Sequence, residues 1–142
     1  MATPSIVIDT NVIVSALRSQ GGWSYELLLL VDQGQFEICL STPVALEYEE
    51  VCRRLLPQLS MTADELDSIL DFLCRCSRKT KVHFRWPSRL PDPSDDAILE
   101  LAVNAGCQCI VTFNTRHFKP AREFGIEVVT PREFIIRLEN PA

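Results

Sequence analysis

The sequence has no long hydrophobic run and lacks several of the short motifs that identify enzymes. Its longest uninterrupted apolar stretch is the five residues from Leu27 to Val31, whereas a membrane-spanning helix needs roughly 20. The first residues, Met-Ala-Thr-Pro, lack the basic and apolar parts of an export signal. There is no Gly-rich phosphate loop, nucleophilic serine elbow or Cys-His signature. We therefore expect a soluble, cytoplasmic protein with no membrane partner.

The six cysteines match neither a disulfide framework nor a zinc site. Disulfide frameworks are typical of small secreted chains, and a chain of this size can form a core without cross-links. Cys74 and Cys76 are separated by one residue, as are Cys107 and Cys109, so neither pair has the C-x-x-C spacing of a zinc knuckle. We expect reduced thiols, most of them packed in the core.

The charge balance excludes one class of nucleic-acid-binding protein. The 142 residues include 14 basic and 19 acidic residues, which gives a formal net charge of −5. A protein that coats nucleic acid by bulk electrostatics needs the opposite sign. Only a local basic patch remains compatible with such a partner.

Apolar runs suited to buried strands alternate with stretches of helical period, which is typical of an α/β domain with a parallel sheet. The expected strands are residues 5–9, 36–40, 81–84, 109–112 and 126–129. The expected helices are residues 12–18, 23–33, 43–56, 62–76, 94–105 and 131–138. No linker, repeat or low-complexity tract interrupts the pattern, so residues 1–142 are expected to form one domain.

Two carboxylates fall on helix faces that should be buried. Glu47 lies within the apolar stripe of the helix expected at 43–56, where apolar residues recur at intervals of three and four. In the next-to-last helix, Asp95 continues the apolar stripe that includes Ile98. Its neighbour Asp96 is predicted to face solvent together with Glu100. Buried carboxylates at these two positions need a chemical explanation.

Asp9 follows the strand segment Ile-Val-Ile, which is apolar enough to be covered on both faces. In open parallel sheets, ligands bind outside the carboxyl ends of the strands. Thr112 and Asn114 end another expected strand, and the two acid-bearing helices open at the same edge. We therefore expect Asp9, Glu47, Asp95 and Asn114 to converge.

Clustered carboxylates repel one another unless a cation neutralises them. Two unit charges about 4 Å apart at an effective dielectric near 20 cost roughly 4 kcal/mol. Hard oxygen ligands favour Mg²⁺ or Mn²⁺, and such an ion can activate water and stabilise charge on a phosphate. Phosphodiester hydrolysis is the chemistry that this pattern favours.

Each acid also has an ordinary structural explanation. Asp9 can cap the helix that follows it, and Glu47 can pair with a buried arginine. Asp92 suits the start of its helix as a cap, with Asp95 favoured there by the helix dipole. His117 matches no ligand pattern and is expected to be a solvated loop residue.

Five segments together resemble the PIN-domain nucleases, and the last resembles the carboxyl end of toxin components (VapC-like) of toxin–antitoxin pairs. They cover nearly the whole chain and follow the motif order of the family. The segments are Ile8-Asp-Thr-Asn-Val12, Leu40-Ser-Thr-Pro-Val-Ala-Leu-Glu-Tyr-Glu-Glu-Val51, Asp92-Pro-Ser-Asp95 with Leu99-Glu-Leu-Ala102, Ile110-Val-Thr-Phe-Asn114 and Ile126-Glu-Val-Val-Thr-Pro-Arg-Glu-Phe134.

The resemblance implies a three-layer α/β/α fold with a central parallel sheet of about five strands. It further implies Mg²⁺- or Mn²⁺-dependent cleavage of single-stranded RNA, an antitoxin partner and a homodimer. Carried over by position, the family's acids fall on Asp9, Glu47 and Asp95, as metal ligands and catalytic residues, and the fourth catalytic position is Asn114. An amide adds no charge, so a second metal site is doubtful. The residues that would orient the metal ligands without binding the metal themselves are Asn11, Thr112 and Asp92.

Two other functions remain open. A phosphatase or dehalogenase-like hydrolase would use Asp9 as a nucleophile, but it needs a second aspartate where this chain has Asn11, and a lysine in a matching context. A binding module with the same fold would recognise RNA or a partner protein without cutting. The amide at Asn114 is the feature that favours this second alternative.

Six of the fourteen basic residues fall between Arg75 and Arg89, a stretch with no acid. This basic segment is expected to be either a solvated loop leading into an edge strand or a surface that contacts RNA phosphates, with an aromatic for base stacking. In the second case the contacting residues would be Arg78, Lys79, Lys81, Arg85 and Trp86.

Overall fold

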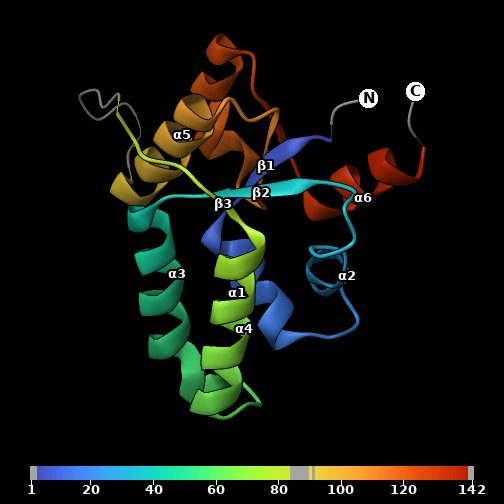
Figure 1. The fold of residues 1–142 in the computed structure, drawn as a ribbon, viewed down its shortest axis with the longest axis vertical. Coiled ribbons are helices and arrows are strands. Elements are labelled where there is room, and N and C mark those ends of the chain that lie inside the picture. Colours follow the sequence, from blue (N-terminus) through green and yellow to red (C-terminus); the bar gives the residue numbers. More distant parts are fainter. Residues whose placement is uncertain (1–2, 84–89, 91, 141–142) are drawn as a thin grey trace.

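The computed structural model describes residues 3–83, 90 and 92–140, which form one parallel sheet flanked by helices (Figure 1). The five strands lie in the order β3-β2-β1-β4-β5, and every neighbouring pair is parallel. Ile6 of β1 is in register with Ile38 on one side and with Cys109 on the other. The strands are β1 (Ser5–Ile8), β2 (Glu37–Leu40), β3 (Arg78–Lys79), β4 (Cys109–Val111) and β5 (Glu127–Val129).

Six α-helices and two 3-10 segments connect or follow these strands. Thr62 and Thr130 begin their helices with reciprocal capping boxes, and Ser41 caps a third helix. The helices are α1 (Thr10–Arg18), α2 (Trp23–Leu29), α3 (Thr42–Leu55), α4 (Ala63–Cys76), α5 (Pro93–Ala105) and α6 (Pro131–Glu139), and the 3-10 segments are η1 (Leu56–Gln58) and η2 (Thr115–Phe124).

The order of the strands explains the layers. From β1 the chain moves outward to β2 and β3, and then crosses to β4 and β5 on the other side of β1. Because crossovers between parallel strands are right-handed, this reversal places the later helices on the opposite face of the sheet. Figure 1 shows α1, α3 and α4 on one side and α5 on the other. The expected three-layer α/β/α architecture is confirmed.

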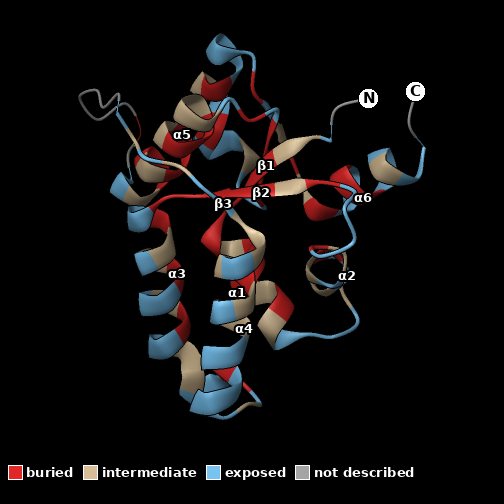
Figure 2. Cartoon of the chain, viewed as in Figure 1, coloured by how far each residue is buried: buried red, intermediate tan, exposed pale blue. Residues whose placement is uncertain are grey.

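The central strands are buried on both faces, as their composition predicted. Ile6, Val7 and Ile8 have no exposed surface, and neither do Ile110 and Val111. Figure 2 shows this buried band running through the middle of the molecule. All six cysteines are free, and four of them are buried. No helix in the described part of the chain is long and apolar enough to cross a membrane.

Most element boundaries agree with the sequence-based expectations to within two residues, and two elements differ by more. The edge strand β3 lies at Arg78–Lys79 rather than at 81–84, because these two polar residues pair with Cys39 and Leu40, whereas residues 81–83 form no strand. Residue 84 lies outside the described residues. The helix expected at 23–33 ends at Leu29, and the turns after it lead to Gly34, whose φ of 79° suits glycine.

Candidate active site

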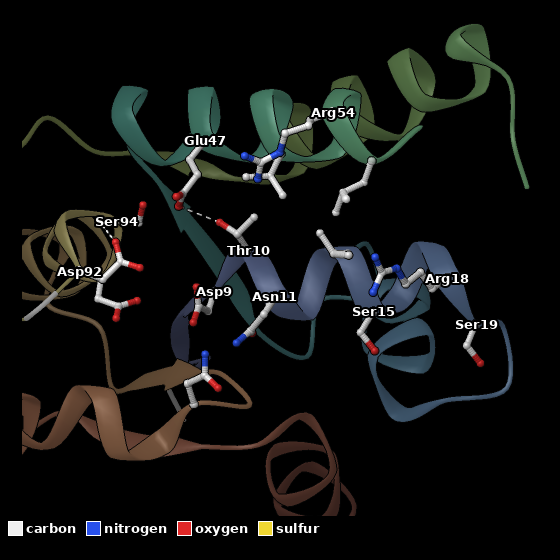
Figure 3. A pocket seen from close by; sticks show the side chains of 15 residues that line it. Asp9, Thr10, Asn11, Ser15, Arg18, Ser19, Glu47, Arg54, Asp92 and Ser94 are labelled. Carbon is white, nitrogen blue, oxygen red and sulfur yellow. Dashed lines mark hydrogen bonds between the residues drawn. The ribbon is translucent and has the colours of Figure 1, made fainter. Parts of the chain in front are cut away.

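A cavity of about 580 Å³ opens at the carboxyl ends of β1 and β4, where the strand order reverses. Ligands of parallel α/β sheets bind at this kind of position. Its lining includes Asp9, Glu47, Asp95 and Asn114. Figure 3 shows Asp9, the residue before α1, and Glu47, on α3, directed into the same space. The four predicted catalytic side chains are thus brought together from four separate parts of the chain.

Asp9 is only 6% exposed and occupies the position before α1, yet its side chain makes no capping hydrogen bond. Its Oδ2 instead accepts a hydrogen bond of 2.7 Å from Thr112 Oγ1. Burial raises the pKa of Asp9 to about 6, and the hydrogen bond from Thr112 opposes this effect. The negative charges of Asp95 and Glu47 raise the same pKa further. The charges of both other carboxylates therefore affect the pKa of Asp9.

Glu47 is half-buried on the face of α3 that its periodicity predicted, whereas Glu49 and Glu50 are exposed. Its Oε2 accepts a hydrogen bond of 2.9 Å from Thr10 Oγ1, at the first position of α1. The next residue, Tyr48, is buried and donates its hydroxyl to the carbonyl oxygen of Ile8. These two bonds fix α3 against the end of β1.

Asp95 lies in the first turn of α5 and is 7% exposed. Burial and the neighbouring Asp92 raise its pKa, while His117 lowers it. His117 Nδ1 lies 3.2 Å from Asp95 Oδ2. His117 is exposed, as predicted, but it lies in η2 rather than in a loop, and no pattern in the sequence predicted its contact with a site carboxylate.

The prediction that Asp96 faces solvent is wrong, because this residue is only 8% exposed. Its Oδ1 accepts a hydrogen bond of 3.2 Å from the backbone N–H of Leu90, which is itself buried. Leu90, which precedes the helix, therefore contacts Asp96 on the face of α5 that was expected in solvent. Asp96 does not line the cavity shared by Asp9 and Asp95.

The residues predicted to support the site lie around it. Thr112 holds Asp9 and also accepts a hydrogen bond of 2.9 Å from the backbone N–H of Asn114. Asn11 Oδ1 accepts from the backbone N–H of Phe113 at 3.5 Å, which ties α1 to the end of β4. Asp92 caps α5 by accepting from the N–H of Ser94 and also lines the cavity.

The donor set suits a hard divalent cation, because four carboxylate side chains and two asparagine amides line one cavity: Asp9, Glu47, Asp92, Asp95, Asn11 and Asn114. Burial is the largest cause of the raised pKa of Asp9, and repulsion from the charges of Asp95 and Glu47 adds to it. Within residues 3–83, 90 and 92–140, however, no three His, Cys, Asp or Glu side chains stand close enough to hold a metal ion. The residues have the right chemistry to bind a divalent cation, but they are not close enough together to coordinate one as they stand.

The described residues of the basic segment do not line the cavity that contains these acids. Arg78 Nε forms an ion pair of 2.8 Å with Glu37, and its Nη2 lies 3.1 Å from Cys39 Sγ and 2.9 Å from the carbonyl oxygen of Ala105. Lys79 and Lys81 line a different cavity of about 340 Å³ beside the start of α3. Arg85 and Trp86 lie outside the described residues.

Sequence reasoning also missed two arginines, Arg18 and Arg54, which line the same cavity as the acids. A signal for both was present. Arg18 lies seven residues after Asn11, and Arg54 lies seven residues after Glu47. A separation of seven places two residues on one face of a helix.

Comparisons with known proteins agree with this geometry. No curated protein sequence matches the chain, whereas twelve chains of solved structures do. One of them belongs to the crystal structure of VapBC2 from Rickettsia felis bound to a DNA fragment from its promoter. The alignment has a TM-score of 0.60 and 18% identity, and covers 88% of this chain and 98% of that one. This structural alignment shows a shared fold.

A family model described as PIN domain matches residues 5–116, and the chain therefore belongs to the PIN domain family.

Proposed function

We propose that this protein is a divalent-metal-dependent endoribonuclease that hydrolyses phosphodiester bonds in single-stranded RNA. The observation that carries the proposal is the convergence of Asp9, Glu47 and Asp95, from three separate elements, on one cavity at the strand reversal. Membership of the PIN family supports hydrolysis of nucleic acid, because PIN domains are generally nucleases. The choice of RNA rests on the resemblance of the chain to the toxin subgroup.

The carboxylates of Asp9, Glu47 and Asp95 would hold Mg²⁺ or Mn²⁺, with the amide oxygen of Asn114 as a further neutral donor. When bound, the cation lowers the pKa of a water molecule and neutralises charge that develops on the phosphate. Three carboxylates supply a formal charge of about −3, so one divalent cation leaves the set slightly acidic. Asn114 adds no charge, and a single cation is therefore the simplest occupancy.

The surrounding residues orient these acids. The hydroxyl of Thr112 holds Oδ2 of Asp9, so that this carboxylate keeps one orientation in the cavity. The hydroxyl of Thr10 does the same for Glu47. His117 Nδ1 contacts Oδ2 of Asp95 and lowers the pKa of this carboxyl, which favours the ionised form.

Two adjacent aspartates provide a matched test. Asp95→Asn should reduce cleavage of a fluorescent single-stranded RNA, in the presence of Mg²⁺ or Mn²⁺, to the level measured in EDTA. Asp96→Asn should retain cleavage, because an asparagine oxygen can still accept the hydrogen bond from Leu90. Circular dichroism would verify that both variants fold. Equal loss of cleavage in both, or its persistence in Asp95→Asn, would refute the assignment.

One observation favours a second candidate, a PIN-fold module that binds RNA without cutting it. Asn114 stands at the fourth position of the site, and the described acids do not form a closed set of ligands. Such a module would bind RNA in EDTA and show no turnover with any divalent cation. Restoring the acid with Asn114→Asp should then create metal-dependent cleavage, whereas in the enzyme it should only change an existing rate.

We further propose that the chain acts as the toxin of a toxin–antitoxin pair and forms a homodimer. The VapBC2 structure, which contains a chain of the same fold, motivates this proposal. Expression of the wild-type chain should arrest bacterial growth, expression of Asp95→Asn should not, and co-expression of the product of an adjacent reading frame should restore growth. Sedimentation equilibrium would give a mass of one chain or of two.

A further inference from the structure

The cavity that holds the acids has a basic end. Arg18 lies in the last turn of α1, and Arg54 lies in the last turn of α3. Both helices begin directly after parallel neighbouring strands and pack against each other. Figure 3 shows both arginine side chains on the cavity side of their helices, beyond the acids.

The length of the helices sets the distance between the two ends. At a rise of about 1.5 Å per residue, Arg18 stands about 13 Å along α1 from Asp9, and Arg54 stands about 10 Å along α3 from Glu47. The lining between the ends includes Val14 together with other apolar side chains. The cavity thus changes from acidic through apolar to basic.

The positive charges at this end are not neutralised by strong ion pairs. Within the described part of the chain, Arg18 forms no ion pair, and its Nη2 donates to the amide oxygen of Gln58 at 3.4 Å. Arg54 Nη1 lies 3.7 Å from Glu50, and both side chains are more than 60% exposed, so this pair contributes little. The adjacent Arg53 differs, because it contacts Asp67 at 2.6 Å and also pairs with Glu49.

A second basic group lies on the opposite side of the acids. A cavity of about 330 Å³ shares Asp92 and Asp95 with the first one and adds Arg116, His117 and Lys119. Arg116 and Lys119 belong to η2, and both are exposed. The carboxylates therefore lie between two groups of cationic side chains.

We propose that the two cavities form one continuous path for single-stranded RNA. The phosphate to be cleaved lies at the carboxylates, Arg18 and Arg54 bind a phosphate on one side of it, and Arg116 and Lys119 bind a phosphate on the other. This inference rests on the proposed function and assigns the binding of the flanking RNA to residues other than the basic segment. Arg78 of that segment is already bound to Glu37, Cys39 and Ala105.

The dimensions favour a strand over a small phosphate ester. A stacked single strand rises about 3.4 Å per nucleotide, so a span of about 13 Å corresponds to about four nucleotides. A mononucleotide placed at the acids is shorter than the separation along α1 between the backbone positions of Asp9 and Arg18. The apolar middle of the cavity offers a surface for bases or sugars between the two charged ends.

The test measures binding without turnover. A fluorescein-labelled RNA of about twelve nucleotides is titrated in EDTA at several salt concentrations, and binding is followed by anisotropy. Each phosphate contact on a single strand contributes about 0.7 to the slope of log K against log salt. Each pair binds one phosphate, so the double variants Arg18→Ala/Arg54→Ala and Arg116→Ala/Lys119→Ala should each flatten the slope by about 0.7.

Two further variants act as comparisons. Arg53→Ala/Arg132→Ala removes the same charge from exposed residues outside both cavities, and it should leave the slope unchanged. Lys79→Ala/Lys81→Ala tests the basic segment and should also leave it unchanged. An unchanged slope in either cavity variant, a flattened slope in the Lys79/Lys81 variant, or no salt-dependent binding by the wild-type protein would overturn the path.

Cleavage assays separate this inference from the proposed function. With Mg²⁺ or Mn²⁺, Arg18→Ala/Arg54→Ala should lower kcat/KM for the long RNA by a larger factor than kcat/KM for a dinucleotide. If the wild-type protein does not cleave but the salt slopes behave as expected, the path stands and the nuclease proposal falls. If it cleaves and the slopes do not change, the path falls alone.

Discussion

Replacing Asp9 by asparagine should stabilise the metal-free protein at neutral and alkaline pH. Asp9 is 6% exposed, and burial raises its pKa from 3.8 in the unfolded chain to about 6 in the fold. The fold therefore disfavours the ionised form of this side chain. An asparagine has no charge to bury, and its Oδ1 can still accept the hydrogen bond from Thr112.

The shift gives the magnitude and the pH range. One pKa unit corresponds to about 1.36 kcal/mol, so a rise of about two units costs the folded state about 3 kcal/mol when Asp9 is ionised. Below pH 3.8 the carboxyl is protonated in both states, and there is no cost. The cost grows between pH 3.8 and about 6 and is complete above that range. The substitution removes it, so the gain in stability appears as the pH rises.

Urea denaturation in EDTA at pH 4 and at pH 8 measures this effect. The free energy of unfolding of Asp9→Asn should exceed that of the wild type by about 3 kcal/mol at pH 8, roughly 10 °C in Tm, and by little at pH 4. Asp32→Asn, at an exposed position after α2, is the matched control and should show no such difference. A variant that is less stable than the wild type at pH 8 would refute the reasoning, because the carboxylate charge would then be favourable in the fold.

Three other predictions follow from the same site. Millimolar Mg²⁺ or Mn²⁺ should raise the Tm of the wild type in differential scanning fluorimetry, because a cation at 100 times its Kd adds about 2.7 kcal/mol to the free energy of unfolding. The Tm of Asp9→Asn should rise much less, and equal shifts would place the ion elsewhere. Tyr48→Phe leaves the carbonyl of Ile8 without its buried donor and should lower the free energy of unfolding in urea by about 1–3 kcal/mol. His117→Gln removes a charge that lowers the pKa of Asp95, so the acidic limb of the pH profile of kcat/KM should move to higher pH; an unmoved limb would mean that the contact has no influence on Asp95.

Residues that depend on a single element could be placed from the sequence. The segment Ile-Val-Ile identified β1 as a buried central strand, and Asp9 was therefore placed at its carboxyl end. Glu47 was placed on the buried face of α3 by the spacing of its apolar neighbours. These properties need only local periodicity and the rule that parallel sheets bind ligands at one edge.

Residues whose environment comes from a distant segment could not be placed in this way. Asp96 was expected in solvent because the periodicity of α5 identifies only the apolar stripe of that helix. It does not show that Leu90, which precedes the helix, contacts Asp96 on the other face. The edge strand β3 has only two polar residues, so it gives no apolar signal. The contact of His117 with Asp95 depends on the path of η2, which no periodicity describes.

The reversal of strand order also determines when the site can assemble during synthesis. β1 is the first strand to be made, but its neighbour β4 follows about a hundred residues later, and the hydrogen bond from Thr112 to Asp9 joins residues 103 positions apart. At roughly 5–20 residues per second, translation delays the arrival of Thr112 by about 5–20 s. A ribosome-bound chain therefore carries Asp9 and Glu47 for seconds before β4 can fix them in place. Nascent chains that stop before β4 lack the complete cavity, whatever the folding rate of their first helices.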